Sequence, residues 1–373
     1  MNELITNLII FIFSFCPLKR KKILFFSYYG SQYGCNPKYI SEYIQDNSND
    51  YDIVWAFNTP ERYSIGGIRK VRYYSLSFFY ELCTAKFIVT NYRMPLFFRK
   101  RKRQIYIQTW HSSLRLKTIE KDAESKLTPE YVKMAKHDSK AIDCLLSGCR
   151  YSTDIFKSSF WYDGFILECG TPRNDLFFTQ VSNIRKKIDF TYSISEHTRI
   201  VLYAPTFRKD YSLDYYNIDY TKLVQALSAR FGGEWTVLVR LHPHLQQYSR
   251  QLLAESNVFD ATSYDDIQEL LAASDIIISD YSSLMFDFSL TGRPCFLYLP
   301  DLEEYTRNDR RLYFDIKKLP YIKAYSNDDL IESIKLFDET NYRNDLIDFN
   351  SQIGSFENGT SCQQILYYIN NKC

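Results

Sequence analysis

The sequence predicts an α/β protein with two doubly wound, Rossmann-like domains that face each other across a cleft. Short apolar runs, rich in β-branched and aromatic residues, alternate with helical stretches along most of the chain. This alternation predicts parallel βαβ units, and 373 residues are enough for two domains of ordinary size. A charged fraction of 24% and a hydrophobic fraction of 45% are typical of a folded protein and exclude a disordered chain.

The first half of the chain is expected to form a domain over residues 23–185. A turn rich in Gly, Ser and Asn at 30–36 leads from the first strand into a helix at 37–45, and Pro37 suits the first turn of that helix. The predicted strands lie at 23–28, 53–57, 71–74, 87–90, 104–108, 145–147 and 165–168.

The second half is expected to form a domain over residues 186–350, after a polar and charged break near 182–198. The final stretch, 328–373, has a helical pattern, and its last part, 351–373, is expected to be a helix that packs back on the protein. The predicted strands of this half lie at 200–203, 235–241, 258–261, 276–278 and 296–299.

Residues 1–22 form a separate segment, in which 4–16 are nearly uncharged and 19–22 are all basic. The apolar part is too short to cross a bilayer, which takes about 20 residues. It could lie in the inner leaflet with its basic residues on anionic lipid, or it could pack on the protein itself. We favour the first interpretation, which predicts a peripheral protein on the cytoplasmic face of the cell membrane.

Charge, motifs and cysteine content argue against a nucleic-acid partner, a zinc ribbon and a disulfide framework. A net charge of +2 is too small for the whole protein to attract a polyanion, so any basic surface must be local. The densest basic run, 99–103, could contact nucleic acid, anionic lipid or an anionic polymer, or could be a solvated loop. Since no nucleic-acid-binding signature accompanies it, we expect no nucleic-acid partner. Nine scattered cysteines without a Cys-x-x-Cys pair argue against a zinc ribbon or a disulfide framework.

The stretch 273–301 reads as strand, tight turn, helix and strand. Ser282 and Ser283 follow the first strand and open the helix, and Gly292 closes it. A helix N-terminus at the carboxyl end of a parallel strand favours an anion, which predicts a phosphate site. A capped helix without a ligand explains the same residues, because Ser is an ordinary N-cap.

Asp287 interrupts an apolar run inside that helix, where a carboxylate without a partner would be costly. It is expected either to accept a hydrogen bond from a ligand hydroxyl or to pair with Arg293.

Three further strand ends carry candidate residues. His111 follows the strand at 104–108 and suits a general base, although a structural histidine remains the alternative. Arg208 follows the strand at 200–203 and could bind a phosphate with two hydrogen bonds or lie on the surface. His242, held extended by the proline after it, could reach a phosphate, and a metal shared with His244 is a weaker alternative.

Five motifs occur in order between residues 23 and 315 and together resemble the CDP-glycerol glycerophosphotransferase family, which builds teichoic acids and related polymers. The motifs are Gly-Cys-Asn-Pro at 34–37, Thr-Trp-His at 109–111, Tyr-Ala-Pro-Thr-Phe-Arg at 203–208, Arg-Leu-His-Pro at 240–243 and Ser-Asp-Tyr-Ser-Ser at 279–283. One departure is Ser112, where the family usually has glycine. Glycine permits a close approach of the backbone to the substrate, so the serine is expected to reshape the acceptor side of the site.

The resemblance implies a GT-B-like fold and transfer of glycerol phosphate, or a related polyol phosphate, from a CDP-activated donor. The acceptor would be a hydroxyl of a membrane-linked glycan or polyol-phosphate chain, CMP would leave, and no metal or cofactor would be required. A glycosyltransferase of the same architecture that uses a nucleotide sugar remains the alternative.

The same resemblance assigns roles to eight residues of this chain. It implies that His111 is the catalytic base and that Asp287 lies near the ribose or polyol. It places donor pyrophosphate contacts at His242, Arg208, Ser282 and Ser283, and acceptor-side contacts at Asn36 and Lys117.

Overall fold

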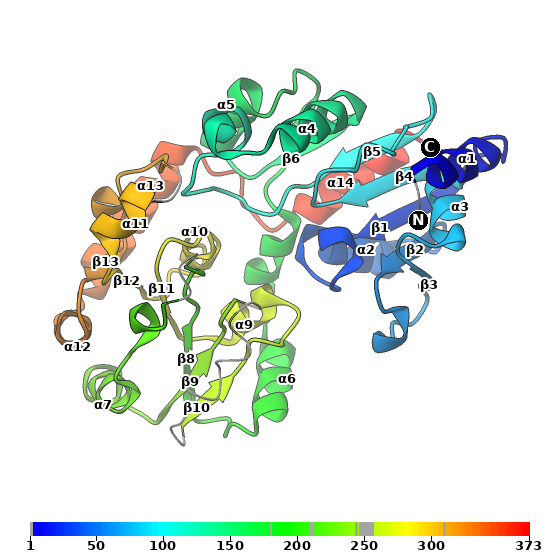
Figure 1. The fold of residues 1–373 in the computed structure, drawn as a ribbon. Coiled ribbons are helices and arrows are strands. Elements are labelled where there is room, and N and C mark those ends of the chain that lie inside the picture. Colours follow the sequence, from blue (N-terminus) through cyan, green and yellow to red (C-terminus); the bar gives the residue numbers. More distant parts are fainter. Residues whose placement is uncertain (1–2, 180, 209–211, 243–244, 246–256, 309–310) are drawn as a thin grey trace. The chain divides into compact units, whose positions relative to one another are not determined.

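The structure is a computed structural model that describes residues 3–373 except 180, 209–211, 243–244, 246–256 and 309–310 (Figure 1). The chain divides into two compact units. Unit 1 comprises Met1–Ser113, Ile119–Phe178 and Ser355–Cys373, and unit 2 comprises Leu114–Thr118 and Thr179–Gly354. Each unit contains a parallel sheet with helices, which confirms the predicted α/β class with two doubly wound domains.

Among the described residues, unit 1 contains a seven-stranded parallel sheet in the order β3-β2-β1-β4-β5-β6-β7. The strand order reverses between β1 and β4, and ligands of open α/β sheets bind outside the carboxyl ends of strands at such a switch point. The strands are β1 (Lys19–Phe26), β2 (Asp52–Phe57), β3 (Arg69–Arg72), β4 (Ala85–Thr90), β5 (Ile105–Gln108), β6 (Cys144–Ser147) and β7 (Ile166–Glu168).

Helices cover the sheet of unit 1, and two of them come from opposite ends of the chain. Ile40 of α2 and Ile365 of α14 belong to one core cluster with Trp55 of β2, so the C-terminal helix packs on the N-terminal sheet (Figure 1). The helices are α1 (Glu3–Phe13), α2 (Cys35–Asn47), α3 (Leu76–Thr84), α4 (Pro129–Ala141), α5 (Arg150–Ser159) and α14 (Ser361–Asn370).

The four basic residues at 19–22 are not all exposed to solvent. They belong to β1, and Lys22 is fully buried, where its ammonium pairs with Glu81 of α3 and donates to Thr84 Oγ1 at 2.7 Å. Burial lowers the pKa of Lys22, and Glu81 opposes that shift. The expectation that all four basic residues contact lipid is therefore wrong for Lys22, because the strand directs it into the protein.

Helix α1 packs on the protein with one side and exposes apolar residues on another. Thr6 and Ile10 are buried, and the Thr6 hydroxyl lies 3.4 Å from that of Tyr74. The helix spacing places five large apolar side chains on the exposed side, each at least half exposed: Leu4, Ile5, Leu8, Phe11 and Ile12. Phe15, just after the helix, is exposed as well. Within the described part of the chain, no helix is both long and apolar enough to span a bilayer.

Unit 2 contains a parallel sheet in the order β10-β9-β8-β11-β12-β13, with its switch point between β8 and β11. The strands are β8 (Arg199–Tyr203), β9 (Trp235–Val239), β10 (Val258–Asp260), β11 (Ile276–Ser279), β12 (Cys295–Tyr298) and β13 (Ile322–Ala324). The helices within the described ranges of this unit are α6 (Ser182–Tyr192), α7 (Tyr220–Phe231), α9 (Ile267–Ala273), α10 (Leu284–Ser289), α11 (Leu302–Asn308), α12 (Asn327–Lys335) and α13 (Glu339–Ile353).

Two features of unit 2 differ from the sequence-based expectation. The polar stretch near 182–198 contains the helix α6, whose Ile188 is buried, so the unit begins before this stretch rather than within it. The edge strand β13 was missed, because three residues with a lysine at the centre do not form an apolar run.

Glu81→Gln should lower the free energy of unfolding by about 3 kcal/mol, because it leaves the buried Lys22 ammonium opposite a neutral amide. Denaturant titration followed by circular dichroism measures the change. The matched control is Glu61→Gln, whose carboxylate pairs with Arg72 at the surface and should contribute less than about 1 kcal/mol. Equal effects of the two substitutions would show that the Lys22 pair is not a buried ion pair.

Candidate functional site

His111 lies in the loop that follows β5, at the carboxyl edge of the unit 1 sheet. The start of the loop continues the sheet, since Thr109 N donates to Thr90 O at 2.9 Å. The next residue leaves the sheet, and Trp110 N donates to the side-chain Oε1 of Gln108 at 2.9 Å. The His111 side chain is partly exposed, and its Nδ1 lies 3.3 Å from Asn91 O. A proton on Nδ1 directed at this carbonyl leaves the lone pair on Nε2, which is the tautomer that a general base needs.

Asn36 holds this loop rather than facing solvent. Its side chain is 1% exposed, and its Nδ2 donates to Thr109 O at 3.2 Å and Trp110 O at 3.0 Å. Its Oδ1 accepts from Arg173 N at 3.2 Å. Since both ends of the amide bond to backbone groups, the geometry favours a positioning role for Asn36 over the acceptor contact that the resemblance implied.

A buried ion network beside Trp110 was missed by the sequence analysis. Arg93 is 2% exposed, pairs with Glu120 and Asp138 at 3.0 Å each, and lies 3.6 Å from the centre of the Phe160 ring and 5.7 Å from that of Trp110. Burial opposes the charged form of Arg93, but the two carboxylates outweigh it and raise its pKa. Burial raises the pKa of Asp138, and Arg93 opposes that shift. The network fixes the indole next to His111.

Two tyrosines from other loops of unit 1 lie beside His111. The rings of Tyr92 and Tyr28 lie 5.3 and 6.5 Å from the His111 ring. Tyr28 and Tyr29 follow each other with φ of 48° and 56°, and Trp110 has φ of 52°. Left-handed non-glycine residues cost about 1–3 kcal/mol each and cluster at functional sites. Burial raises the pKa of Tyr29 to about 12, so its hydroxyl is neutral at physiological pH.

In unit 2, Asp280 joins the loops that follow β8 and β11. Its carboxylate is 1% exposed and accepts from Thr206 N at 2.8 and 2.9 Å and from Thr206 Oγ1 at 2.6 Å. The loop after β9 is adjacent, because Arg240 N donates to Tyr203 O at 2.8 Å. The structure thus brings three of the predicted motifs of this unit to one edge of its sheet.

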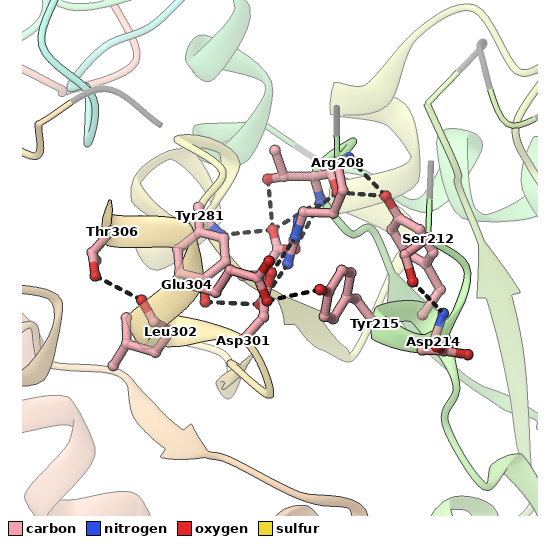
Figure 2. Close-up of polar contacts among 12 residues, drawn as sticks. Arg208, Ser212, Asp214, Tyr215, Tyr281, Asp301, Leu302, Glu304 and Thr306 are labelled. Atoms are coloured by element: carbon pink, nitrogen blue, oxygen red, sulfur yellow. Dashed lines mark hydrogen bonds and ion pairs between the residues drawn. The ribbon is translucent and has the colours of Figure 1, made fainter. Parts of the chain in front are cut away.

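Arg208 is enclosed by carboxylates (Figure 2). It is 5% exposed, its Nε and Nη2 donate to Asp301 at 2.6 and 3.0 Å, and its Nη1 donates to Asp280 at 2.8 Å. Tyr281 Oη donates to Asp301 at 3.0 Å. Burial opposes the charged guanidinium, but the two carboxylates outweigh it and raise the pKa of Arg208. Since all three guanidinium nitrogens bond to carboxylates and the side chain is buried, the geometry favours a positioning role over the pyrophosphate contact that the resemblance implied.

Ser282 and Ser283 lie between β11 and α10, and both are partly exposed. The Ser282 hydroxyl accepts from Leu284 N at 3.4 Å, and the Ser283 hydroxyl accepts from Leu116 N at 3.4 Å. Helix α10 has only six residues, so its dipole is weaker than the sequence analysis assumed. Both hydroxyls can still donate to a phosphate oxygen while accepting these bonds.

Asp287 is fully buried, and its Oδ2 accepts from Gln268 Nε2 at 3.5 Å. The alternative pairing with Arg293 is not adopted, because Arg293 donates to the carbonyls of Ala272, at 3.0 Å, and Ser274 at the end of α9. Burial lowers the pKa of Arg293 to about 10. Because Asp287 is buried and bonds to Gln268, its location favours a structural role, in holding α10, over the ribose or polyol contact that the resemblance implied.

His242 is exposed after β9, and its ring lies 5.2 Å from that of Phe207. Exposure suits the pyrophosphate contact. His244, considered as a possible metal ligand with His242, lies outside the described residues. Within the described ranges, no group of three His, Cys, Asp or Glu side chains could hold a metal ion.

Lys117 belongs to unit 2, although the sequence analysis placed it in the N-terminal domain. It forms an antiparallel bridge with Leu312, and Thr118 N donates to Arg311 O at 2.8 Å. The Lys117 ammonium lies 5.0 Å from the centre of the Tyr305 ring. The segment Leu114–Thr118 therefore belongs to unit 2, although it directly follows in sequence the loop that carries His111.

The residues that sequence reasoning missed also follow strands. Asp301 lies three positions after β12, and Arg93 lies three positions after β4. Considering every charged residue just after a predicted strand would have included both. Their partners could not have been identified this way, because Asp301 is 93 positions from Arg208 in the chain.

A family model described as CDP-glycerol:poly(glycerophosphate) glycerophosphotransferase matches residues 8–371. The teichoic acid poly(glycerol phosphate) polymerase of Bacillus spizizenii is 31% identical over 97% of this chain and 95% of its own length. The teichoic acid glycerol-phosphate transferase of Staphylococcus aureus is 31% identical over 93% of this chain and 92% of its own length. The chain spans 48% of the Bacillus subtilis polymerase.

A solved structure of the wall teichoic acid polymerase TagF matches with a TM-score of 0.85 and 30% identity, over 98% of this chain and 93% of that one. A solved structure of a putative UDP-N-acetylglucosamine 2-epimerase from Listeria monocytogenes matches with a TM-score of 0.53 at 11% identity, over 94% of this chain and 95% of that one. This match indicates likeness of fold alone.

Arg208→Lys should lower the free energy of unfolding of the ligand-free protein by about 3 kcal/mol, because an ammonium cannot bond to both carboxylates as the guanidinium does. Denaturant titration measures the change, and the exposed Arg307→Lys is the control, expected within about 0.5 kcal/mol. If the Arg208→Lys variant were as stable as the wild type, Arg208 would instead be assigned to ligand binding.

Proposed function

We propose that the chain, which belongs to the CDP-glycerol:poly(glycerophosphate) glycerophosphotransferase family, uses His111 as the general base of glycerophosphate transfer. The protein is a transferase that moves glycerol phosphate from CDP-glycerol in the synthesis of a cell-wall polymer. The observation that carries the assignment of His111 is its place at the carboxyl edge of the sheet, partly exposed, with Nδ1 directed at Asn91 O.

The reaction needs a base and a stabilised leaving group. His111 Nε2 removes the proton from the acceptor hydroxyl while the hydroxyl oxygen attacks the phosphorus that bears the glycerol. The bond from this phosphorus to the bridging oxygen of the pyrophosphate breaks, and CMP leaves with the bonding electrons. Charge then builds on the phosphate oxygens, where fixed hydrogen-bond donors stabilise the transition state.

Unit 2 supplies the proposed donor contacts. Ser282, Ser283 and His242 are partly or fully exposed and can reach the pyrophosphate. Arg208 and Asp287 act indirectly, because their buried groups hold the loop after β8 and the helix α10. In this assignment Asn36 likewise positions the His111 loop.

The proposed acceptor is a hydroxyl of a lipid-linked glycan or polyol-phosphate chain at the cytoplasmic face of the membrane. A charged nucleotide donor does not cross a bilayer, so transfer from it belongs on the side where the donor is made. The exposed apolar side of α1 supports attachment to the bilayer surface. Basic residues border this side, since Arg101 Nη1 donates to Cys16 O at 2.7 Å, just after α1.

Release of CMP from CDP-glycerol in the presence of a lipid-linked saccharide tests the function directly. A second measurement separates it from the nucleotide-sugar alternative. A ligand specific for the native state raises thermal stability according to its affinity, so CDP-glycerol should raise the melting temperature more than UDP- or GDP-sugars do. Greater stabilisation by a sugar nucleotide would contradict the proposal.

His111→Ala should lower kcat by roughly 10²–10⁴-fold, the usual contribution of a general base, while the affinity for CDP-glycerol is retained. Stopped-time assays of CMP release and isothermal titration with CDP-glycerol measure the two quantities. The control is His197→Ala, whose imidazole is exposed in unit 2 and has no proposed role. Lost donor affinity with retained turnover would show that His111 binds the donor instead.

Leu8→Ser together with Phe11→Ser should weaken binding to anionic vesicles at least about 30-fold, because each apolar side chain contributes about 1–2 kcal/mol when lipid covers it. Co-sedimentation with vesicles measures the change, and circular dichroism checks the fold. Phe190→Ser together with Leu336→Ser removes apolar groups of unit 2 that are even more exposed, and it should have no effect. Unchanged sedimentation of the α1 variant would move the membrane contact to another surface, such as the loop at 99–103.

A further inference from the structure

Helix α4 of unit 1 presents a basic side that the proposed chemistry does not use. Lys133, Lys136 and Lys140 are exposed and recur at helical spacing, and His137 lies among them. With Glu124, Leu127, Pro129 and Val132, these residues line a surface hollow of about 650 Å³. We call Lys133, Lys136 and Lys140, with this hollow, the basic face of α4.

The basic face carries net positive charge. Glu124 pairs with Lys136 at 3.2 Å, and both side chains are close to half exposed. Within the described ranges, Lys133 and Lys140 form no ion pair with a carboxylate. A rise of about 1.5 Å per residue spreads the three ammonium groups over about 10 Å of the helix. An extended anion with several charges therefore fits this face better than a single small ion.

The opposite side of α4 is rigidly held. Asp138 is fully buried and accepts from Arg93, from Tyr106 Oη at 2.9 Å and from Met94 N at 3.0 Å. Ser139 Oγ donates to Phe160 O at 2.7 Å. Because these contacts fix the helix, the three lysines project from a preformed surface, which reduces the ordering cost of binding.

The basic run at 99–103 continues the basic face of α4. His137 Nε2 lies 2.8 Å from Phe98 O, and Lys100 pairs with Asp143 just after α4. The same run contacts the end of α1 through the bond from Arg101 to Cys16 O. Basic residues thus extend from the proposed membrane-binding helix to α4 within unit 1.

We propose that the basic face of α4 binds the polyol-phosphate chain of a polymeric acceptor. This inference rests on the proposed function, in which each added unit brings one negative charge. Several weak ion pairs acting on one chain raise the overall affinity more than any one of them could. Leu127, Pro129 and Val132 give the hollow an apolar lining that suits the methylene groups of the polyol.

A lipid bilayer fits this face less well. Surface-lying helices insert large apolar side chains into the bilayer, as the exposed side of α1 could. None of the exposed large hydrophobic residues within the described ranges lies on α4. The face therefore has charge without an apolar side to insert, which favours a soluble polyanion segment over the bilayer itself.

The test compares the unsubstituted chain with two triple variants. The first is Lys133→Gln, Lys136→Gln and Lys140→Gln. The control is Lys317→Gln, Lys318→Gln and Lys335→Gln, which removes the same charge from exposed positions of unit 2, including a lysine paired with a nearby glutamate. The acceptor probes are a synthetic glycerol-phosphate oligomer with many phosphates and an acceptor with a single phosphate.

The α4 variant should show about a tenfold higher KM and Kd for the oligomer, while kcat and the KM for the single-phosphate acceptor change by less than about twofold. The control should match the wild type with both acceptors. Equal behaviour of the two variants with the oligomer would overturn the inference. Weaker binding of the α4 variant to phosphatidylglycerol vesicles, with unchanged oligomer binding, would assign the face to the membrane and overturn it as well.

Failure of the proposed function would give a different result. The wild type would then release no CMP from CDP-glycerol with either acceptor. Direct binding of the oligomer, measured by isothermal titration without donor, would still show whether the α4 lysines contact a polyol-phosphate chain.

Discussion

Buried polar side chains hold two loops at the carboxyl ends of the parallel strands, and the placement of His111 and Arg208 depends on them. These loops leave the regular hydrogen-bonding pattern of the sheet, so their backbone groups need other partners. Asn36 supplies them for the loop before His111, and Asp280 supplies them for the loop before Arg208. Without such partners, each buried backbone group would cost about 1–3 kcal/mol.

The same constraint separates residues that hold the site from residues that are available to a ligand. Arg208 and Asn36 have the chemistry of ligand contacts, yet their polar atoms are directed at other parts of the protein. His111, His242 and Ser282 lie just after β5, β9 and β11, and they keep some exposure. In both units, the buried groups therefore position their exposed neighbours.

Unit 1 carries two different kinds of exposed surface. One side of α1 is apolar, whereas the exposed side of α4 is basic and has no large exposed apolar residue among those described. The loop at 99–103 contacts the chain next to both helices, through Arg101 after α1 and Lys100 after α4. The acceptor that we propose has a lipid at one end and phosphates along its length. The lipid would match the apolar side of α1, and the phosphates would match the basic side of α4.

Left-handed backbone conformations gather around His111. Tyr28, Tyr29 and Trp110 adopt them although none is glycine, and their strain has to be offset by the surrounding contacts. The Arg93 network and the Asn36 amide provide such contacts next to Trp110. A side chain in a strained but well-held loop keeps one orientation, which supports the proposal that His111 is the general base.

The sequence by itself determined the α/β class, the strands that end at candidate residues and the family to which the chain belongs. These follow from local periodicity and from short motifs, which are visible without knowing any long-range contact. Only the tertiary structure decided that Lys22 is buried, that Arg208 bonds to Asp280 and Asp301, and that Lys117 belongs to unit 2. The physical reason is that the environment of a charge depends on residues far along the chain, such as the 93 positions between Arg208 and Asp301, and local pattern carries no information about them.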